Sequence, residues 1–217
     1  MGTAAILSEN RENLPCNVRF LFQPAEETSG GAVPMINDGC LQEVDAVFGL
    51  HVNPLIEAGK IGIKYGAMNA SSTGLYLKIT GKSCHGAYPS EGIDAIVAAA
   101  QVISSIQSVV SRNIDSRDSV VISFGKIIGG EKENIIAQEV LCYGTMRTLS
   151  DETKKKAKER LKTVVEMVSG AYGAVGEINF HDSYTALINH DEYVDIIKEN
   201  SEKFLGNEIK DIYKVNI

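Results

Sequence analysis

The stretch SSTGLYLKIT, residues 71–80, decides how the middle of this chain folds. Apolar or methyl-bearing side chains stand at every second position, at Thr73, Leu75, Leu77 and Ile79, and more exposed types stand between them. A period of two places one set of side chains on a buried face and the other set toward solvent. We therefore predict a half-buried strand in a sheet that has one covered face.

The sequence after this strand has the pattern of one α+β unit. Apolar residues recur at helical spacing over residues 94–110 and again after Ser150, a suitable N-cap with two acidic residues following in the first turn. Three further segments have strand character: 119–128, 137–148 and 174–184. The order strand, helix, strand, strand, helix, strand is that of a ferredoxin-like unit, an antiparallel sheet with two helices on one face.

The flanks of this unit have a different character. We predict that residues 71–184 form an inserted domain, and that residues 1–70 and 185–217 form part of an α/β sheet domain. In the first flank, the apolar runs 18–22 and 46–52 favour neighbouring parallel strands covered on both faces. Further elements are expected around them: helices at 1–13, 31–41 and 193–205, and a strand at 211–217.

Composition and charge exclude some functions. The 217 residues carry a net charge of −7 without a long basic run, which argues against nucleic acid or an anionic membrane as a partner. No apolar run approaches the ~20 residues of a membrane span, and no signal peptide is apparent. The four cysteines are widely spaced and include no C-x-x-C pair, so we expect a reducing, cytoplasmic setting.

Two adjacent carboxylates follow the first apolar run, in VRFLFQPAEE, residues 18–27. At the end of a strand, neighbouring side chains diverge, so Glu27 can bind a metal ion while Glu26 reaches a metal-bound water as a general base. The alternative is a solvated acidic pair at a turn, because such pairs are common on surfaces. The pair alone does not decide between these interpretations.

Four more polar residues are candidates for a site. His51 ends the second apolar run, in DAVFGLHVNP, and would emerge beside Glu27 if the runs are neighbouring parallel strands. His85 lies in a glycine-rich loop, GKSCHGAYPSEGIDAI, where it could bond a substrate oxygen. Asn134 and Arg147 belong to GGEKENIIAQEVLCYGTMRT, and a guanidinium at a strand end can clamp a carboxylate. The alternatives are a structural histidine, an exposed loop histidine and a surface arginine.

Taken together, these four segments resemble the family of metal-dependent aminoacylases and carboxypeptidases. They occur in the order of that family, and YTALINH, residues 184–190, is similar to the next landmark. The resemblance implies a two-metal amidohydrolase that cleaves N-acyl amino acids or related peptides. It also implies a catalytic α/β domain and an inserted lid or dimerisation domain, through which the chain would form a homodimer.

The same resemblance implies a role for each candidate residue. Glu26 would be the general base, and Glu27 and His51 would be metal ligands. His85 would help polarise the scissile carbonyl, often in the partner subunit's site. Asn134 and Arg147 would bind the carboxylate end of the substrate. Zinc, manganese, cobalt or nickel would suit the proposed metal ligands.

The sequence also departs from the family pattern. The cysteine-histidine segment that supplies further ligands is absent here, as is a later histidine ligand. Because each ion of a hydrolytic pair usually needs about three protein ligands, we expect that this chain alone holds no complete metal pair and is not an active hydrolase. A second interpretation is a non-catalytic binding or dimerisation module carried by residues 71–184.

Overall fold

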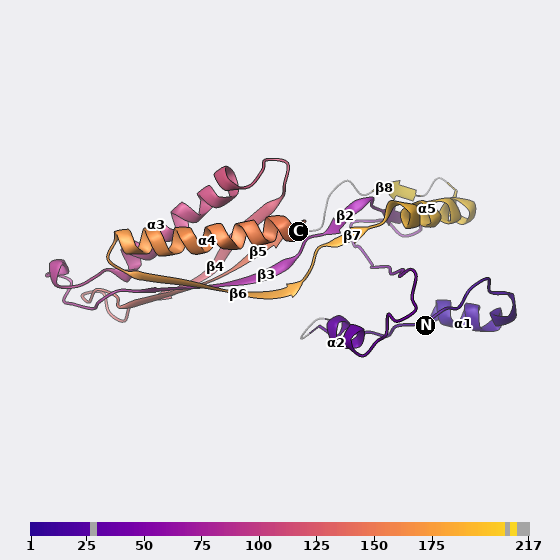
Figure 1. Ribbon diagram of the computed structural model, residues 1–217, viewed down its shortest axis with the longest axis horizontal. Helices are drawn as coiled ribbons and strands as arrows, with labels where there is room; N and C mark the ends of the chain where they lie inside the picture. The colour runs from indigo at the N-terminus through magenta and orange to yellow at the C-terminus, as the bar shows by residue number, and fades with distance from the viewer. Residues whose placement is uncertain (27–29, 207–208, 212–217) are drawn as a thin grey trace. The chain divides into compact units, whose positions relative to one another are not determined.

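The computed structural model describes residues 1–26, 30–206 and 209–211, and these form two compact units (Figure 1). The first unit comprises residues 1–52 and the second comprises residues 53–217. Its described residues include the helices α1 (Gly2–Glu9) and α2 (Ala32–Asn37) and the 3₁₀ turn η1 (Arg11–Asn13). Helices are therefore present near residues 1–13 and 31–41, as predicted, although the second is shorter.

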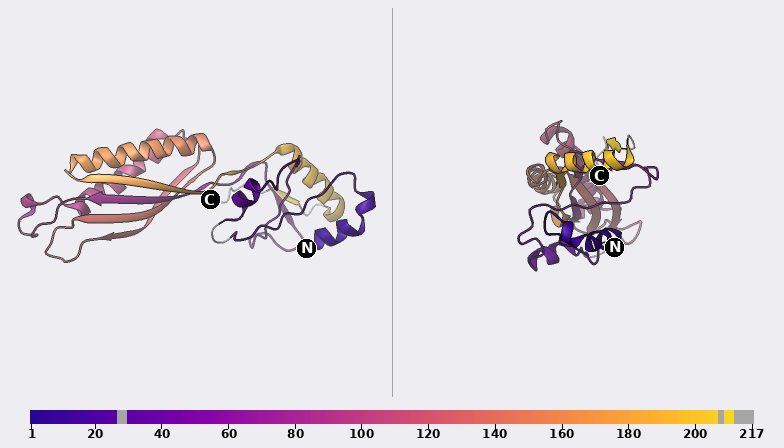
Figure 2. Two further views of the ribbon diagram at one scale, coloured as in Figure 1. Left: turned by 60° about the horizontal axis from the view of Figure 1, so that its bottom comes forward. Right: turned by 90° about the vertical axis from the view of Figure 1, so that its right-hand side faces the viewer.

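A four-stranded antiparallel sheet forms the centre of the second unit. Its elements follow one another as β3 (Ser72–Thr80), α3 (Ala95–Ser108), β4 (Val120–Gly129), β5 (Glu139–Thr148), α4 (Asp151–Ala171) and β6 (Val175–Tyr184). The strand order in the sheet is β4-β5-β3-β6, and every neighbouring pair is antiparallel. Both helices cover the same face, and the other face is open (Figures 1 and 2). The predicted element order is thus confirmed, while the domain limits at residues 70 and 184 remain predictions.

The core of this unit lies between the covered face of the sheet and the two helices. From β3 it receives the alternating residues of the opening stretch, with Leu75, Leu77 and Ile79 at most 1% exposed. Helix α3 contributes a stripe at helical spacing that includes Ala99, Val102 and Ile106, and α4 contributes Ala157, Leu161 and Val165. Burying these side chains contributes roughly 25 cal/mol per Å² of apolar surface, which makes this layer the main source of stability.

Both helices begin at capped N-termini. The carboxylate of Asp94 accepts bonds from the backbone N–H groups of Ile96 and Val97, at 2.9 and 3.1 Å. The hydroxyl of Ser150 accepts from the N–H of Thr153 at 3.1 Å, as its sequence position predicted. Such caps satisfy N–H groups that have no partner inside the helix and stabilise each helix by about 1 kcal/mol.

The two apolar runs of the first unit are not strands, and that prediction is wrong. Residues 18–22 and 46–52 have no regular secondary structure, and in the described part of residues 1–52 neither has a hydrogen-bonded partner strand. The guanidinium of Arg19 instead donates to the carbonyl oxygens of Cys40 and Gln42. Leu50 is 92% exposed. An apolar run becomes a buried strand only where another strand and a covering layer meet it.

Shorter elements flank the four-stranded sheet. β1 (Ile61–Ile63) pairs in parallel with β8 (Ile209–Asp211), and β2 (Gly66–Asn69) pairs antiparallel with β7 (Leu187–Asn189). Helix α5 (Asp191–Leu205) agrees with the helix predicted at 193–205. The strand predicted at 211–217 falls almost entirely outside the described residues.

Among the residues that the structure describes, one helical stretch is long and apolar enough to cross a membrane by length and composition alone. Helix α3 and the π-helical turn η3 (Val109–Asn113) together span these 19 residues, Ala95–Asn113. The core helix of a soluble domain has the same length and composition, and Ala98, Val102 and Ile106 are fully buried against the sheet.

Candidate functional site

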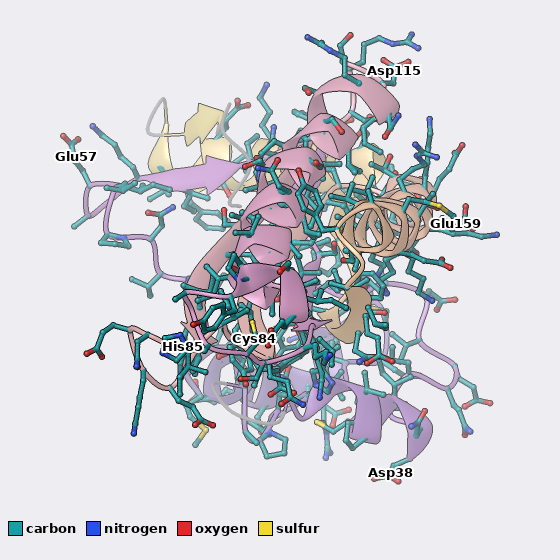
Figure 3. The ribbon with its side chains drawn as sticks, turned by 90° about the vertical axis from the view of Figure 1, so that its left-hand side faces the viewer. Asp38, Glu57, Cys84, His85, Asp115 and Glu159 are labelled. Carbon is teal, nitrogen blue, oxygen red and sulfur yellow. The ribbon has the colours of Figure 1, made fainter. Side chains whose placement is uncertain are left out.

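His85 and Asn134 are brought together by two loops at one end of the four-stranded sheet. Beyond Thr80 the chain continues to pair with the segment that precedes β5. The backbone N–H of Ile136 donates to the carbonyl oxygen of Cys84 at 2.9 Å, and the backbone N–H of Gly86 donates to the carbonyl oxygen of Asn134 at 2.8 Å. His85 itself forms an isolated antiparallel bridge with Ile135. Cys84 and His85 lie next to one another at this end of the unit (Figure 3).

Glycines shape the His85 loop. A Cβ atom on Gly86 would lie 3.1 Å from the carbonyl oxygen of Asn134, and one on Gly92 would lie 2.6 Å from that of Lys82. Both distances are shorter than ordinary contacts, and the groups that would have to move are backbone atoms. The close approach that holds His85 beside Asn134 therefore depends on glycine at these positions.

The ring of His85 has one nitrogen committed and one facing outward. Its Nδ1 accepts a bond from the N–H of Ala87 at 3.1 Å, so in the neutral ring Nε2 carries the proton. The side chain is exposed, and the ring of Tyr88 lies 5.7 Å away. An N–H donor in this position can stabilise negative charge that develops on a carbonyl oxygen.

Arg147 lies near the end of β5 and belongs to the open face of the sheet. It is half-buried and pairs with Val121 of β4. Its Nη1 donates to the hydroxyl of Thr145 and to the carbonyl of Met146, the latter at 3.3 Å. The guanidinium is thus held against β5 through Nη1, and a guanidinium has further N–H donors that can bind a planar anion such as a carboxylate.

The sheet holds Arg147 far from His85 and Asn134 within one chain. Glu139 pairs with Thr80 at the end of β3 that leads to the His85 loop, and Arg147 stands eight residues further along β5. At a rise of about 3.3 Å per residue, this separates them by about 26 Å, and the loops extend further still. One chain therefore does not bring the three residues to a single small-molecule site.

The remaining candidates belong to the first unit. Glu26 is exposed and follows Ala25, whose φ of 53° marks a tight turn. Glu27 lies outside the described residues. His51 is exposed, and its Nδ1 lies 2.7 Å from the carbonyl oxygen of Val52. If Nδ1 donates to that carbonyl, Nε2 is left unprotonated, which is the form in which histidine binds a metal ion.

The described residues do not form a complete metal site. Within residues 1–26, 30–206 and 209–211, no group of three or more histidine, cysteine, aspartate or glutamate side chains is placed to hold an ion. His51 is chemically suited as a ligand, but alone it does not satisfy the requirement of about three protein ligands.

Two residues on the open face near Arg147's end of the sheet were given no role from the sequence. Thr145 holds the guanidinium, and the period of two along β5 would have placed both side chains on one face. His181 of β6, to which no role was given, pairs with Gly74 of β3. Its position follows from strand register, which the sequence alone does not specify.

Curated relatives are similar in sequence to this chain over most of its length. It is 36% identical over 203 residues to N-acetyl-L-cysteine deacetylase of Bacillus subtilis, covering 94% of this chain and 49% of that protein. It is 40% identical over 192 residues to N-acetyldiaminopimelate deacetylase of Priestia megaterium, covering 86% of this chain and 51% of that protein. The chain thus spans about half the length of these curated relatives.

Solved structures show the same fold. A structure from methicillin-resistant Staphylococcus aureus superposes with a TM-score of 0.89 at 31% identity, over 96% of this chain and 55% of the other. A dinuclear metal-binding peptidase of the M20 family from Bacillus subtilis gives a TM-score of 0.80 at 29% identity, over 100% of this chain and 54% of the other. The model of Peptidase family M20/M25/M40 matches residues 1–216, and the chain belongs to this family.

Proposed function

We propose that this chain is part of an amidohydrolase that cleaves N-acyl amino acids. The observation that carries the proposal is the family match over residues 1–216, together with relatives whose names specify removal of an acyl group from an amino acid. Residues 71–184 act as its inserted lid or dimerisation domain. A reducing, cytoplasmic setting is supported by the four cysteines, which are all free thiols.

The proposed roles follow from the chemistry of each side chain. Arg147 binds the carboxylate of the substrate through parallel N–H bonds. The Nε2–H of His85 donates to the scissile carbonyl oxygen, where negative charge develops, and the amide of Asn134 adds a second donor beside it. Glu26 takes a proton from the attacking water and delivers it to the leaving amine, which completes hydrolysis without net proton change.

The metal ligands in this proposal are Glu27 and His51. Metal binding is a property of the family, as the dinuclear peptidase from Bacillus subtilis shows for its own chain. Zinc, manganese, cobalt or nickel would suit a carboxylate and an imidazole. In the described residues nothing completes the ligand set, so the proposed chemistry of this chain is limited to binding, orientation and proton transfer.

A metal titration will test whether the chain is catalytic by itself. We expect fewer than two zinc or manganese ions per chain and no turnover of an N-acetyl amino acid, because two ligands hold a catalytic ion poorly. Isothermal titration calorimetry with an amine-release assay measures both quantities. Two bound ions with turnover would contradict the prediction. Persistent binding of the substrate without turnover would favour the second interpretation, a non-catalytic binding module.

The geometry of the sheet supports a site shared between two chains. His85 and Asn134 lie at one end of the sheet, and Arg147 lies at the other. A two-fold axis that pairs an edge strand with its copy in antiparallel fashion places one chain's His85 end beside the partner's Arg147 end. Such pairing brings the two ends onto the same side of a continuous sheet, about four strand spacings of about 4.8 Å apart, which is closer than the two ends of one chain.

The β4 edge is better suited to this contact than the β6 edge. Ile127 and Ile128 of β4 are 59% and 49% exposed, and Val97 on the adjacent helix α3 is also exposed. The exposed residues of β6 are mainly polar, and they include Glu177 and Asn179. An apolar, exposed edge strand favours pairing with another chain, while a polar edge resists it.

Replacing Ile127 by lysine (I127K) should therefore weaken the dimer by about tenfold or more, because a charge would be buried in an apolar edge contact. The matched control is Val175→Lys at the opposite edge, where Val175 is 62% exposed and the dimer should be unaffected. Light scattering over a concentration series measures the association. A wild-type chain that stays monomeric at the highest concentration would contradict the proposal.

A further inference from the structure

A closed turn over residues 85–88 sets the orientation of the His85 ring. The backbone N–H of Tyr88 donates to the carbonyl oxygen of His85 at 2.8 Å, which closes the turn. Inside it, the backbone N–H of Ala87 donates to Nδ1 of His85 at 3.1 Å. A neutral imidazole has one donor and one acceptor nitrogen, so a closed turn keeps the proton on Nε2.

The side chain of Cys84 holds this turn from the residue that precedes it. Its Sγ lies 3.4 Å from the carbonyl oxygen of Tyr88, to which the thiol donates. The same carbonyl oxygen accepts from the backbone N–H of Glu91 at 3.1 Å, so both of its lone pairs are used. The thiol thus connects the residue before His85 to the residue that closes its turn.

The sulfur atom fits at this place because residue 92 is a glycine. A Cβ atom on Gly92 would lie 2.5 Å from Sγ of Cys84 and 3.2 Å from its Cβ. The segment around Gly92 is itself fixed, because Lys82 and Ile93 exchange two backbone hydrogen bonds of 2.9 Å. The side chain of Cys84 therefore lies directly over the Gly92 backbone, in space that any other residue at position 92 would fill.

The backbone on either side of His85 is held from outside the loop, and the turn is not. The carbonyl oxygen of Cys84 and the N–H of Gly86 both bond to the segment before β5. Residues 87 and 88, in contrast, are held by contacts within the loop, which are the two bonds to His85 and the thiol of Cys84. Loss of the thiol therefore loosens the turn without releasing the rest of the loop.

We propose that Cys84 is a positioning residue for His85. Its thiol holds the carbonyl of Tyr88, the closed turn keeps the N–H of Ala87 on Nδ1, and Nε2 retains the proton that it donates to the substrate. Cys84 acts through the turn and does not contact the substrate. The inference rests on the proposed function, because donation from Nε2 to the scissile carbonyl oxygen is the role proposed for His85.

Nitrogen-15 NMR of the histidine rings tests this in the full chain without substrate. The chain has four histidines, so the His85 signal can be assigned by its loss in His85→Gln. At about pH 8.5, where an ordinary imidazole is neutral, the wild-type ring should be mainly in the Nε2–H form. Cys84→Ala should lower the ratio of the Nε2–H to the Nδ1–H form about threefold, as the loss of one weak hydrogen bond would give. The amide hydrogen of Tyr88 should exchange faster by a similar factor.

Two further variants isolate the donor. Cys84→Ser differs from Cys84→Ala only by a hydroxyl group that can donate to the Tyr88 carbonyl, so it should retain the wild-type ratio. Ser83→Ala is the matched control, because Ser83 is the exposed neighbour of Cys84 and its replacement should leave the ring unchanged.

The positioning role and the proposed function fail in different ways. An unchanged tautomer ratio in Cys84→Ala, or an equal fall in Cys84→Ser or Ser83→Ala, would overturn the role of the Cys84 thiol. The proposed function is tested by adding N-acetyl-L-alanine to the wild-type chain and following Nε2 of His85. No change there at saturating ligand would count against the role of His85 in catalysis and leave the positioning by Cys84 intact.

Discussion

Gly144→Val should unfold the four-stranded unit at temperatures where the native chain is stable. Gly144 lies in the middle of β5, between β3 and β4, and a Cβ atom there would lie 2.4 Å from the carbonyl oxygen of Ser123. The same atom would lie 2.8 Å from Cδ1 of Phe124, whose ring occupies the space that a side chain would need. Relief requires movement of both the ring and the β4 backbone.

We expect this substitution to lower the free energy of unfolding by about 3 kcal/mol, the upper range for overpacking a core. Single domains are stable by only about 5–15 kcal/mol, so a loss of this size is large. Urea denaturation followed by circular dichroism measures it. The matched control is Gly125→Val in β4, where nothing lies within 4 Å of the new Cβ atom and the change should be small. Equal losses for the two variants would contradict the argument.

The four-stranded unit could be predicted from the sequence because its signals are local. The alternation in β3, the helical stripe in α3 and the cap at Ser150 each specify one element without reference to the rest of the chain. Right-handed crossovers and short connections then leave few ways to join six such elements. The observed order β4-β5-β3-β6 is the one that a ferredoxin-like pattern implies.

The first unit could not be predicted in the same way. Residues 18–22 and 46–52 have the composition of buried strands, but composition does not specify which segment would supply the neighbouring strand. In the described residues no such neighbour is present, and the runs remain irregular and largely exposed. An element that depends on a distant partner is specified by tertiary contacts and not by its own pattern.

The sequence predicted the individual residues of the candidate site but not their positions relative to one another. His85 and Asn134 were separate loop residues in the sequence, and only the continued pairing beyond Thr80 shows that they meet. Arg147 was predicted at a strand end, and strand length alone sets it far from Asn134. The pairing of Gly74 with His181 depends on register, which one sequence does not fix where the face is polar.

The second large effect is expected at Leu161, in the core layer between α4 and the sheet. Leu161 is fully buried on the face of α4 that packs into the core with α3 and the sheet. Removing three carbon atoms loses their burial and leaves a cavity that the surrounding strands can only partly fill. Leu161→Ala should therefore lower the free energy of unfolding by about 3 kcal/mol, within the range of 2–5 for such changes.

Glu159→Ala provides the control, because Glu159 lies on the same helix and its side chain points outward (Figure 3). The expected change there is within about 0.5 kcal/mol, as for most surface positions. Hydrogen exchange should show faster opening of β3 and β6 in Leu161→Ala and native rates in the control. If both variants were equally stable, α4 would not be part of the core and the argument from burial at Leu161 would be wrong.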